Sequence, residues 1–105
     1  MSESLRKTEE MTKHHDHGIL NVCICYNGKD EITSAIQNNP TTKQEFEAGL
    51  LGGYNVKPEI LIRTSNEVRL SGFLLYQTNE CYMAFIETMW PAFSLWEFLK
   101  IIMNY

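Results

Sequence analysis

The sequence predicts an α/β fold in which a mostly parallel sheet is flanked by helices. Strand-like apolar stretches alternate along the chain with amphipathic stretches, which is the pattern of an α/β layer architecture. The first strand-like stretch, residues 19–26, is almost continuously apolar, as in a strand that is covered on both faces of a parallel sheet. At 105 residues, 44% of them hydrophobic, the chain suffices for at most one domain with a core of its own.

The first part of the chain is expected to hold two helices around this strand. Residues 4–13 have a helix-forming composition, although few of them are apolar. The strand over 19–26 ends at the turn signal Asn27-Gly28. A helix over 29–37 follows, with acidic residues in its first turn, and Asn38-Asn39-Pro40 stops it.

The same alternation continues to the end of the chain. Thr41 or Thr42 can cap another helix, which Gly52-Gly53 would end. The later elements are a strand over 59–62, a short amphipathic helix over 70–77, a strand over 82–86, a turn at Trp90-Pro91 and a last helix capped by Ser94.

Composition and charge exclude some function classes. The formal net charge is −4, from 9 basic and 13 acidic residues, which argues against a general nucleic-acid binder because such a protein needs a basic surface. No apolar run approaches the roughly 18–20 residues that span a bilayer. The polar N-terminal stretch carries no signal-peptide pattern, so neither a transmembrane segment nor entry to the secretory pathway is expected.

The cysteines and histidines near the N-terminus have two interpretations. Cys23 and Cys25 lie two residues apart in the predicted strand and would share one face, as half of a metal site with His14, His15 and His17. The favoured interpretation is that both cysteines are small buried apolar residues in a reduced compartment. No second Cys or His pair stands at zinc spacing.

The predicted sheet has too few strands and helices around it to cover its buried strands. A buried parallel strand needs a hydrogen-bonded neighbour on each side and helices above and below it. Three predicted strands, two of which are apolar enough to be fully buried, scarcely supply these neighbours.

Polar and cationic residues gather where the strand over 59–62 ends. Ligands of open α/β sheets bind at the carboxyl ends of strands, and Arg63 lies there. Residues 64–66 could add hydroxyl, amide and backbone donors, while Arg69 and Ser71 would begin the next helix, whose N-terminus favours an anion. The pattern predicts a phosphate or diphosphate site. The alternative is a surface network in which these arginines pair with Glu59 and Glu67.

A family resemblance favours the diphosphate site. The stretch LIRTSNEVRLSGFLLYQ, followed by MWPAFSLWEFL, closely resembles the C-terminal signature of the cis-prenyltransferases, the undecaprenyl and dehydrodolichyl diphosphate synthases. LNVCICYNGKDEITSAI and SLRKTEEMTK are similar to the elements that precede this signature in the family. The resemblance implies that residues 1–105 form a single partial domain, the C-terminal portion of the family's mostly parallel sheet and its flanking helices.

The resemblance also implies a reaction and its setting. Family members condense isopentenyl diphosphate onto an allylic prenyl diphosphate, with magnesium as cofactor. A dimer with itself or with a homologous subunit is implied, at the cytosolic face of the endoplasmic reticulum, with peripheral membrane association of the complex and no nucleic-acid partner.

Individual positions match the family's substrate-binding residues. By resemblance, Arg63, Arg69 and Ser71 bind the diphosphate of isopentenyl diphosphate, and Glu67 orients the arginines. Residues 73–76 match a helix that helps to build the family's dimer interface.

The departures from the family pattern concern catalysis. Asn66 replaces the motif's glycine, Tyr76 replaces a tryptophan, and Tyr82 stands where bacterial members have a magnesium-binding glutamate. The family's Met-Asp-Gly-Asn-Arg segment, whose aspartate positions magnesium, does not occur in the sequence. No catalytic residue and no metal ligand is therefore assigned, and the chain is expected to be inactive alone. Alternatives are a non-catalytic partner subunit of a full-length synthase and a small anion-binding domain unrelated to prenyl chemistry.

Overall fold

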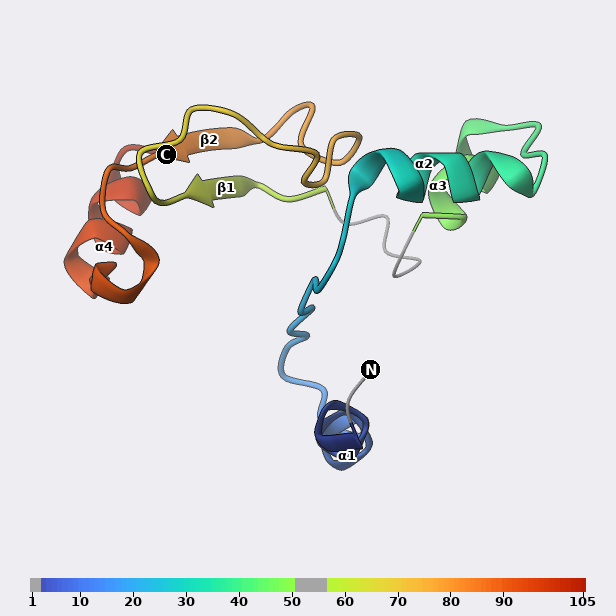
Figure 1. Cartoon of the computed structure of the whole chain (residues 1–105), viewed down its shortest axis with the longest axis horizontal. Helices are drawn as coiled ribbons and strands as arrows, with labels where there is room; N and C mark the ends of the chain where they lie inside the picture. Colours follow the sequence, from blue (N-terminus) through green and yellow to red (C-terminus); the bar gives the residue numbers. More distant parts are fainter. Residues whose placement is uncertain (1–2, 51–56) are drawn as a thin grey trace.

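The computed structural model describes residues 3–50 and 57–105, and these form a mixed α/β chain (Figure 1). The predicted fold class is therefore confirmed. In chain order the elements are α1 (Glu3–Thr12), α2 (Gly28–Gln37), α3 (Lys43–Ala48), β1 (Ile60–Arg63), β2 (Tyr82–Phe85), the 3₁₀ helix η1 (Trp90–Ala92) and α4 (Leu95–Met103).

Strands β1 and β2 form a parallel two-stranded sheet. Ile60 pairs with Tyr82 and Arg63 with Phe85 in its register. The pairing continues past the last strand residue, because the Ile86 N–H donates to the carbonyl of Arg63 at 2.9 Å. Both strands lie where the sequence predicts them, and β1 ends on Arg63, whose side chain is thereby fixed at the carboxyl edge of the sheet.

The strand predicted over residues 19–26 does not form. This stretch, called the apolar segment below, is irregular and connects α1 to α2 (Figure 1). Leu20 is 87% exposed, and Cys23 and Cys25 are exposed too, so the prediction that the cysteines are buried is wrong. A strand needs a neighbour to pair with, and among the described residues neither strand of the sheet pairs with this segment.

Side chains cap the first turns of both α2 and α3. The sequence predicts the cap of α3, whereas at Asn27 it predicts a turn. The Asn27 side chain accepts a hydrogen bond from the Lys29 N–H at 3.1 Å, which starts α2. Of the two candidate caps for α3, Thr42 takes the position, because its hydroxyl accepts from the Glu45 N–H at 3.2 Å. The Gly52-Gly53 stop predicted for this helix lies outside the described residues.

The C-terminal helix α4 begins with a complete capping box. The Ser94 hydroxyl accepts from the Glu97 N–H at 3.3 Å, while the Glu97 carboxylate accepts from the Ser94 N–H at 2.9 Å. The same carboxylate accepts from the Thr88 hydroxyl, and these donors hold the pKa of Glu97 below its ordinary value of 4.5. The cap therefore ties α4 to the loop that follows β2.

The short helix predicted over residues 70–77 is replaced by consecutive turns. Ser71, Gly72 and Leu74 have φ angles of 49°, 84° and 44°, which lie in the left-handed region and interrupt a right-handed helix. This turn segment packs against the two preceding helices instead. Phe46 of α3 meets the ring of Tyr76 edge-on at 5.0 Å between ring centroids.

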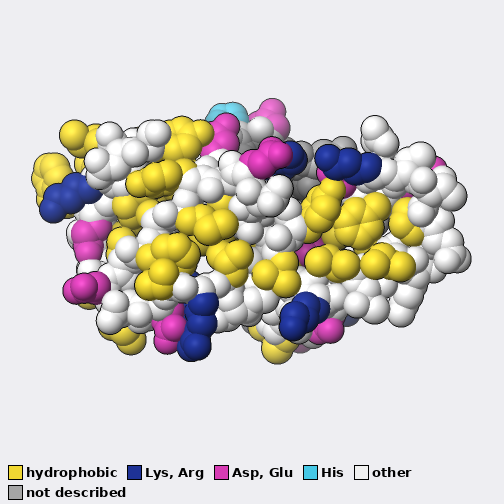
Figure 2. All heavy atoms as spheres, turned by 90° about the horizontal axis from the view of Figure 1, so that it is seen from above, with side chains coloured by type: hydrophobic (Ala, Val, Ile, Leu, Met, Phe, Trp, Pro, Cys, Tyr) yellow, Lys and Arg dark blue, Asp and Glu magenta, His cyan; other side chains and the backbone are white. Residues whose placement is uncertain are grey.

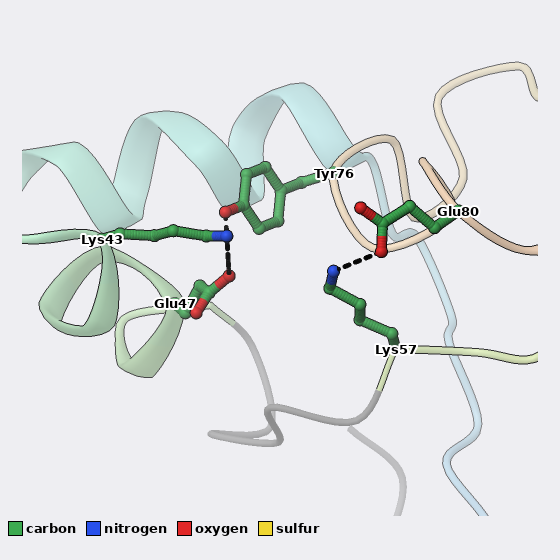
Figure 3. Close-up of polar contacts among 5 residues, drawn as sticks. All are labelled: Lys43, Glu47, Lys57, Tyr76 and Glu80. Carbon is green, nitrogen blue, oxygen red and sulfur yellow. Dashed lines mark hydrogen bonds and ion pairs between the residues drawn. The ribbon is translucent and has the colours of Figure 1, made fainter.

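Polar contacts reinforce the same packing, as Figure 3 shows. The Tyr76 hydroxyl donates to Oε1 of Glu47 at 2.9 Å, and Lys43 approaches the same oxygen at 3.7 Å. Beyond the turn segment, Lys57 and Glu80 form an ion pair at 2.7 Å just before β1 and β2 begin. The turn segment thus lies between α3 and the entrance of the sheet.

The described part of the chain leaves much of its apolar surface open. The accessible surface is 8732 Å², whereas a compact monomer of this length exposes about 6,000 Å². The radius of gyration is 16.0 Å, against about 13 Å for a compact chain of this size. Figure 2 shows hydrophobic side chains uncovered over much of one face. Among the described residues the buried apolar side chains are few and lie in separate parts of the chain: Ala35, Leu50, Leu61 and Ile101.

None of the described helices is both long and apolar enough to cross a membrane.

Candidate anion-binding site at the end of β1

Arg63 is the central cation of the candidate site. Its Nη1 donates to the Ser71 hydroxyl at 3.0 Å and to the carbonyl oxygen of Arg69. Both acceptors are neutral, and among the described residues Arg63 forms no ion pair. The guanidinium is therefore oriented by its neighbours without being neutralised by them.

The second arginine is engaged by an acid. Arg69 Nε lies 2.9 Å from Oε2 of Glu67, and its Nη2 donates to Oε1 at 3.2 Å. Both side chains are well exposed, and exposed pairs of this kind contribute about 0–1 kcal/mol. The surface network expected as an alternative thus holds for Arg69 with Glu67, whereas Arg63 stays outside it. Glu67 orients one arginine directly, not both.

The turn after β1 is hydrogen-bonded to the residues that follow β2. Ser65 and Asn66 have φ angles of 76° and 57°, and asparagine is among the residues that tolerate this region. Their N–H groups donate to the carbonyls of Thr88 and Ile86, at 2.9 and 3.0 Å. The expectation that backbone donors of this turn face an anion is wrong for these two groups, because both are already used.

The helix N-terminus expected at Arg69 and Ser71 is absent as well, since residues 70–77 are turns. What the structure brings together is therefore Arg63, the Ser71 hydroxyl and, through its backbone carbonyl, Arg69. The positive charge of Arg63 and the hydroxyl of Ser71 are the groups that can meet an anion, and the Arg69 side chain is attached to the same loop.

A buried polar cluster beneath the turn segment was not predicted from the sequence. Glu31 of α2 is 2% exposed and accepts hydrogen bonds from the Tyr26 hydroxyl and from Nε2 of Gln77, at 3.0 Å for the latter. Burial is the main cause that raises the pKa of the Tyr26 hydroxyl well above its ordinary value, and the hydrogen bond from this hydroxyl to Glu31 raises it further. In the sequence Glu31 is indistinguishable from an exposed acid in the first turn of a helix, so no local signal reveals the cluster.

A metal centre has no support in this geometry. Within residues 3–50 and 57–105 no group of three or more His, Cys, Asp or Glu side chains is arranged to hold a metal ion. Magnesium prefers several oxygen ligands in near-octahedral arrangement, and the side chains around Arg63 do not offer them. A shallow groove elsewhere, between β2 and α4, is lined by Met83, Phe85 and Ile101 and includes none of the candidate site residues.

Comparisons with known proteins agree on one family. The family model described as "Putative undecaprenyl diphosphate synthase" matches residues 1–105. An isoprenyl transferase of Streptomyces avermitilis is 35% identical over 121 residues, which cover 100% of this chain and 47% of that protein. A human dehydrodolichyl diphosphate synthase complex subunit is 31% identical over 117 residues, covering 100% of this chain and 35% of the relative.

A solved structure shows the same arrangement of elements. The crystal structure of a probable undecaprenyl diphosphate synthase from Campylobacter jejuni matches with a TM-score of 0.81 and 29% sequence identity. The match covers 99% of this chain and 53% of that one, so the chain spans about half the length of the solved relative and less than half of the curated relatives above. Since the family model matches the chain along its whole length, the chain belongs to the undecaprenyl diphosphate synthase family of cis-prenyltransferases.

Proposed function

We propose that Arg63 and Ser71 bind the diphosphate of isopentenyl diphosphate, assisted by Arg69, in a cis-prenyltransferase that condenses this substrate onto an allylic prenyl diphosphate. One observation carries the proposal. In a chain of prenyltransferase ancestry, a guanidinium at the carboxyl end of a strand is fixed by neutral acceptors and lacks an ion pair among the described residues. A guanidinium that is oriented in this way is better explained by diphosphate binding than by a contribution to the stability of the fold.

The hydrogen bonds of Arg63 leave its diphosphate-binding edge open. A guanidinium has five N–H donors, and both contacts of Arg63 use Nη1. No contact to a described residue occupies Nε or Nη2, which lie side by side and can hold two phosphate oxygens at once. Ser71 Oγ accepts from Arg63, so its own proton is available for a third bond to the ligand.

Arg69 would join by exchanging partners. Its exposed bond to Glu67 is weak, and a diphosphate carries more charge than one carboxylate. Each charge-assisted hydrogen bond contributes about 1.5–3 kcal/mol. Two arginines can therefore support micromolar binding, which corresponds to a binding free energy of about −8 kcal/mol. Glu67 then holds Arg69 in place until the ligand arrives.

A binding experiment tests this assignment. Titration calorimetry with isopentenyl diphosphate and with pyrophosphate should give dissociation constants that rise at least about 10-fold in Arg63→Ala, the loss of one or two charge-assisted bonds. The rise should be smaller in Arg69→Ala. Arg6→Ala, an exposed arginine of α1, is the matched control and should bind as the unaltered chain does. Equal binding by Arg63→Ala and Arg6→Ala would contradict the site.

We further propose that this chain carries the acceptor half of the reaction and does not turn over substrate alone. Magnesium supports the departure of the allylic diphosphate in the proposed reaction, and the described residues provide no ligand set for it. An assay of the purified chain with farnesyl diphosphate, isopentenyl diphosphate and magnesium should therefore yield no product. Product formation above the level of an Arg63→Ala control would refute this half-site proposal.

The open apolar surface favours a second candidate, a non-catalytic subunit of a prenyltransferase complex. The surface exceeds that of a compact monomer by an amount typical of a permanent protein interface, and the human relative is named as a subunit of a complex. In this form the chain would pair with itself or with a homologous synthase, peripherally at the cytosolic face of the endoplasmic reticulum. Sedimentation of the chain with a full-length synthase, together with the prenyltransferase rate of the mixture, separates the two candidates. Co-sedimentation with an altered rate supports the subunit, and independent sedimentation of the chain excludes its pairing with a homologous synthase.

A further inference from the structure

Helix α2 begins in direct contact with the loop that carries Ser71. The N–H of Gly28, the first residue of α2, donates to the carbonyl oxygen of Gly72 at 2.6 Å. The first N–H groups of a helix have no partner within the helix, so this carbonyl satisfies one of them. Gly28 is buried at this contact, although α2 is separated from the loop by more than thirty residues of sequence.

The contact is possible only because Gly28 has no side chain. A Cβ atom on Gly28 would lie 2.7 Å from the Gly72 carbonyl oxygen and 3.2 Å from the backbone nitrogen of Leu75. The first distance is shorter than the approach that real Cβ atoms make, and both neighbours are backbone atoms that cannot rotate away. Any larger residue at position 28 therefore has to push the turn segment off the helix.

Gly72 is restricted in the same way from the other side. Its φ angle of 84° suits glycine, and a Cβ atom there would lie 2.9 Å from Oδ1 of Asn27. Asn27 is the residue whose side chain caps α2. The cap, the first helical residue and the loop glycine thus fit against one another as one tight unit.

This unit lies one residue away from the candidate site. Ser71 precedes Gly72 and itself has a φ angle of 49°, a conformation that non-glycine residues keep only when their surroundings impose it. Its hydroxyl is the group that accepts from Arg63 at 3.0 Å. A displaced Gly72 carbonyl would rotate the preceding peptide and move this hydroxyl away from the guanidinium.

We propose that Gly28 is a positioning residue for diphosphate binding: through the Gly72 carbonyl, the start of α2 sets the place of the Ser71 hydroxyl beside Arg63. The inference rests on the proposed function of the Arg63 site. Gly28 itself touches no ligand. Its role is to let a helix approach the loop closely enough to impose the left-handed conformation at Ser71.

The sharpest test substitutes two glycines that differ in their surroundings. Gly28→Ala should weaken pyrophosphate and isopentenyl diphosphate binding about 10-fold, the loss of one charge-assisted hydrogen bond. Gly18→Ala is the matched control, because no atom lies within 4 Å of a Cβ atom placed there. Equal dissociation constants for the two variants would overturn the inference.

A double-mutant cycle separates positioning from general damage. If Gly28 acts through Ser71, the loss caused by Gly28→Ala should shrink toward none when Ser71→Ala is already present. A loss of the same size in both backgrounds would show that Gly28 acts by another route. Arg63→Ala tests the site itself. If Arg63→Ala binds as well as the unaltered chain, the proposed function is wrong. If only Gly28→Ala binds as well as the unaltered chain, the positioning role is wrong and the proposed function stands.

Amide hydrogen exchange on the unaltered chain tests the inference even if Gly28→Ala does not fold. Coupling between two sites is reciprocal, so a ligand that needs the Gly28 contact must also stabilise it. Saturating pyrophosphate should slow exchange of the Gly28 N–H several-fold and leave that of Gly18 unchanged. An unchanged rate at Gly28 would refute the coupling.

Discussion

Two segments of this chain have nearly the same apolar character and different fates. β1 (Ile60–Arg63) is a strand whose Leu61 is 7% exposed, whereas Leu20 in the apolar segment 19–26 is 87% exposed and belongs to no strand. The difference lies in their pairing: β1 pairs with β2 in register, whereas residues 19–26 pair with neither of the described strands. Apolar sequence thus shows that a segment can be buried, and only a partner with unpaired backbone groups makes it a strand.

The largest expected difference between the two segments is in stability. Leu61→Ala should lower the free energy of unfolding by about 2–5 kcal/mol, because it opens a cavity in the small core beside the sheet. Leu20→Ala, its matched control in the apolar segment, should change it by no more than about 0.5 kcal/mol. Urea denaturation followed by circular dichroism measures both. A comparable loss in the two variants would show that residues 19–26 are packed after all.

The next largest effect concerns the capping box that begins α4 and ties it to the loop after β2. Ser94→Ala removes the hydroxyl that accepts from the Glu97 N–H, and losses of this kind amount to about 1 kcal/mol. The same denaturation measurement detects it. Ser4→Ala near the start of α1 is the control and should have little effect, because α1 buries none of its residues. If the two substitutions cost the same, α4 would be as loosely held as α1.

Acidification should weaken the same cap. The Thr88 hydroxyl and the Ser94 N–H and hydroxyl lower the pKa of Glu97, so the carboxylate form is favoured in the folded chain. Its contribution is complete above the ordinary pKa of 4.5 and is lost as the pH falls through the lowered pKa. Melting temperatures measured from pH about 6 to about 3 should therefore fall less steeply in Glu97→Gln than in the unaltered chain. Parallel curves would contradict the linkage.

The smallest expected change in stability comes from a charge placed on the apolar segment. Leu20→Lys should leave the free energy of unfolding within about 0.5 kcal/mol, since the position is solvent-exposed. It should nevertheless reduce self-association, because an uncovered apolar stretch is a contact surface. Light scattering against concentration measures this, with Lys13→Leu as the opposite control. Unchanged scattering in Leu20→Lys would mean that other surfaces drive association.

How far the sequence predicts the fold depends on how local the cause is. The caps at Thr42 and Ser94 were predictable because each needs only a side chain and an N–H three residues away. Both observed strands were predictable from short apolar runs bounded by turns. The turns that replace the helix expected over residues 70–77 could not be predicted from local sequence. The left-handed φ angles at Ser71 and Leu74 depend on contacts with elements that are distant in sequence.

The same distinction between local and long-range causes applies to the candidate site. Arg63 was predicted at the carboxyl end of a strand and is the last residue of β1, and its contact with Ser71 spans only eight residues. The use of the Ser65 and Asn66 N–H groups by carbonyls beyond β2 could not be foreseen, because it depends on how the two strands are aligned. The role proposed for Gly28 depends on a contact with Gly72, which is still more distant in sequence. A lone glycine after an asparagine predicts only an ordinary turn.

The parallel register of the sheet has a kinetic consequence. Ile60 and Tyr82 are 22 residues apart, and parallel strands cannot be joined by a tight hairpin. The chain must therefore close a long loop, at an entropic cost, before the first ladder bond forms. Docking of Tyr76 on α3 shortens that search by holding the middle of the loop in place. We expect β1 and β2 to join late during folding, after the turn segment has settled, so the candidate site at Arg63 is among the last features to take shape.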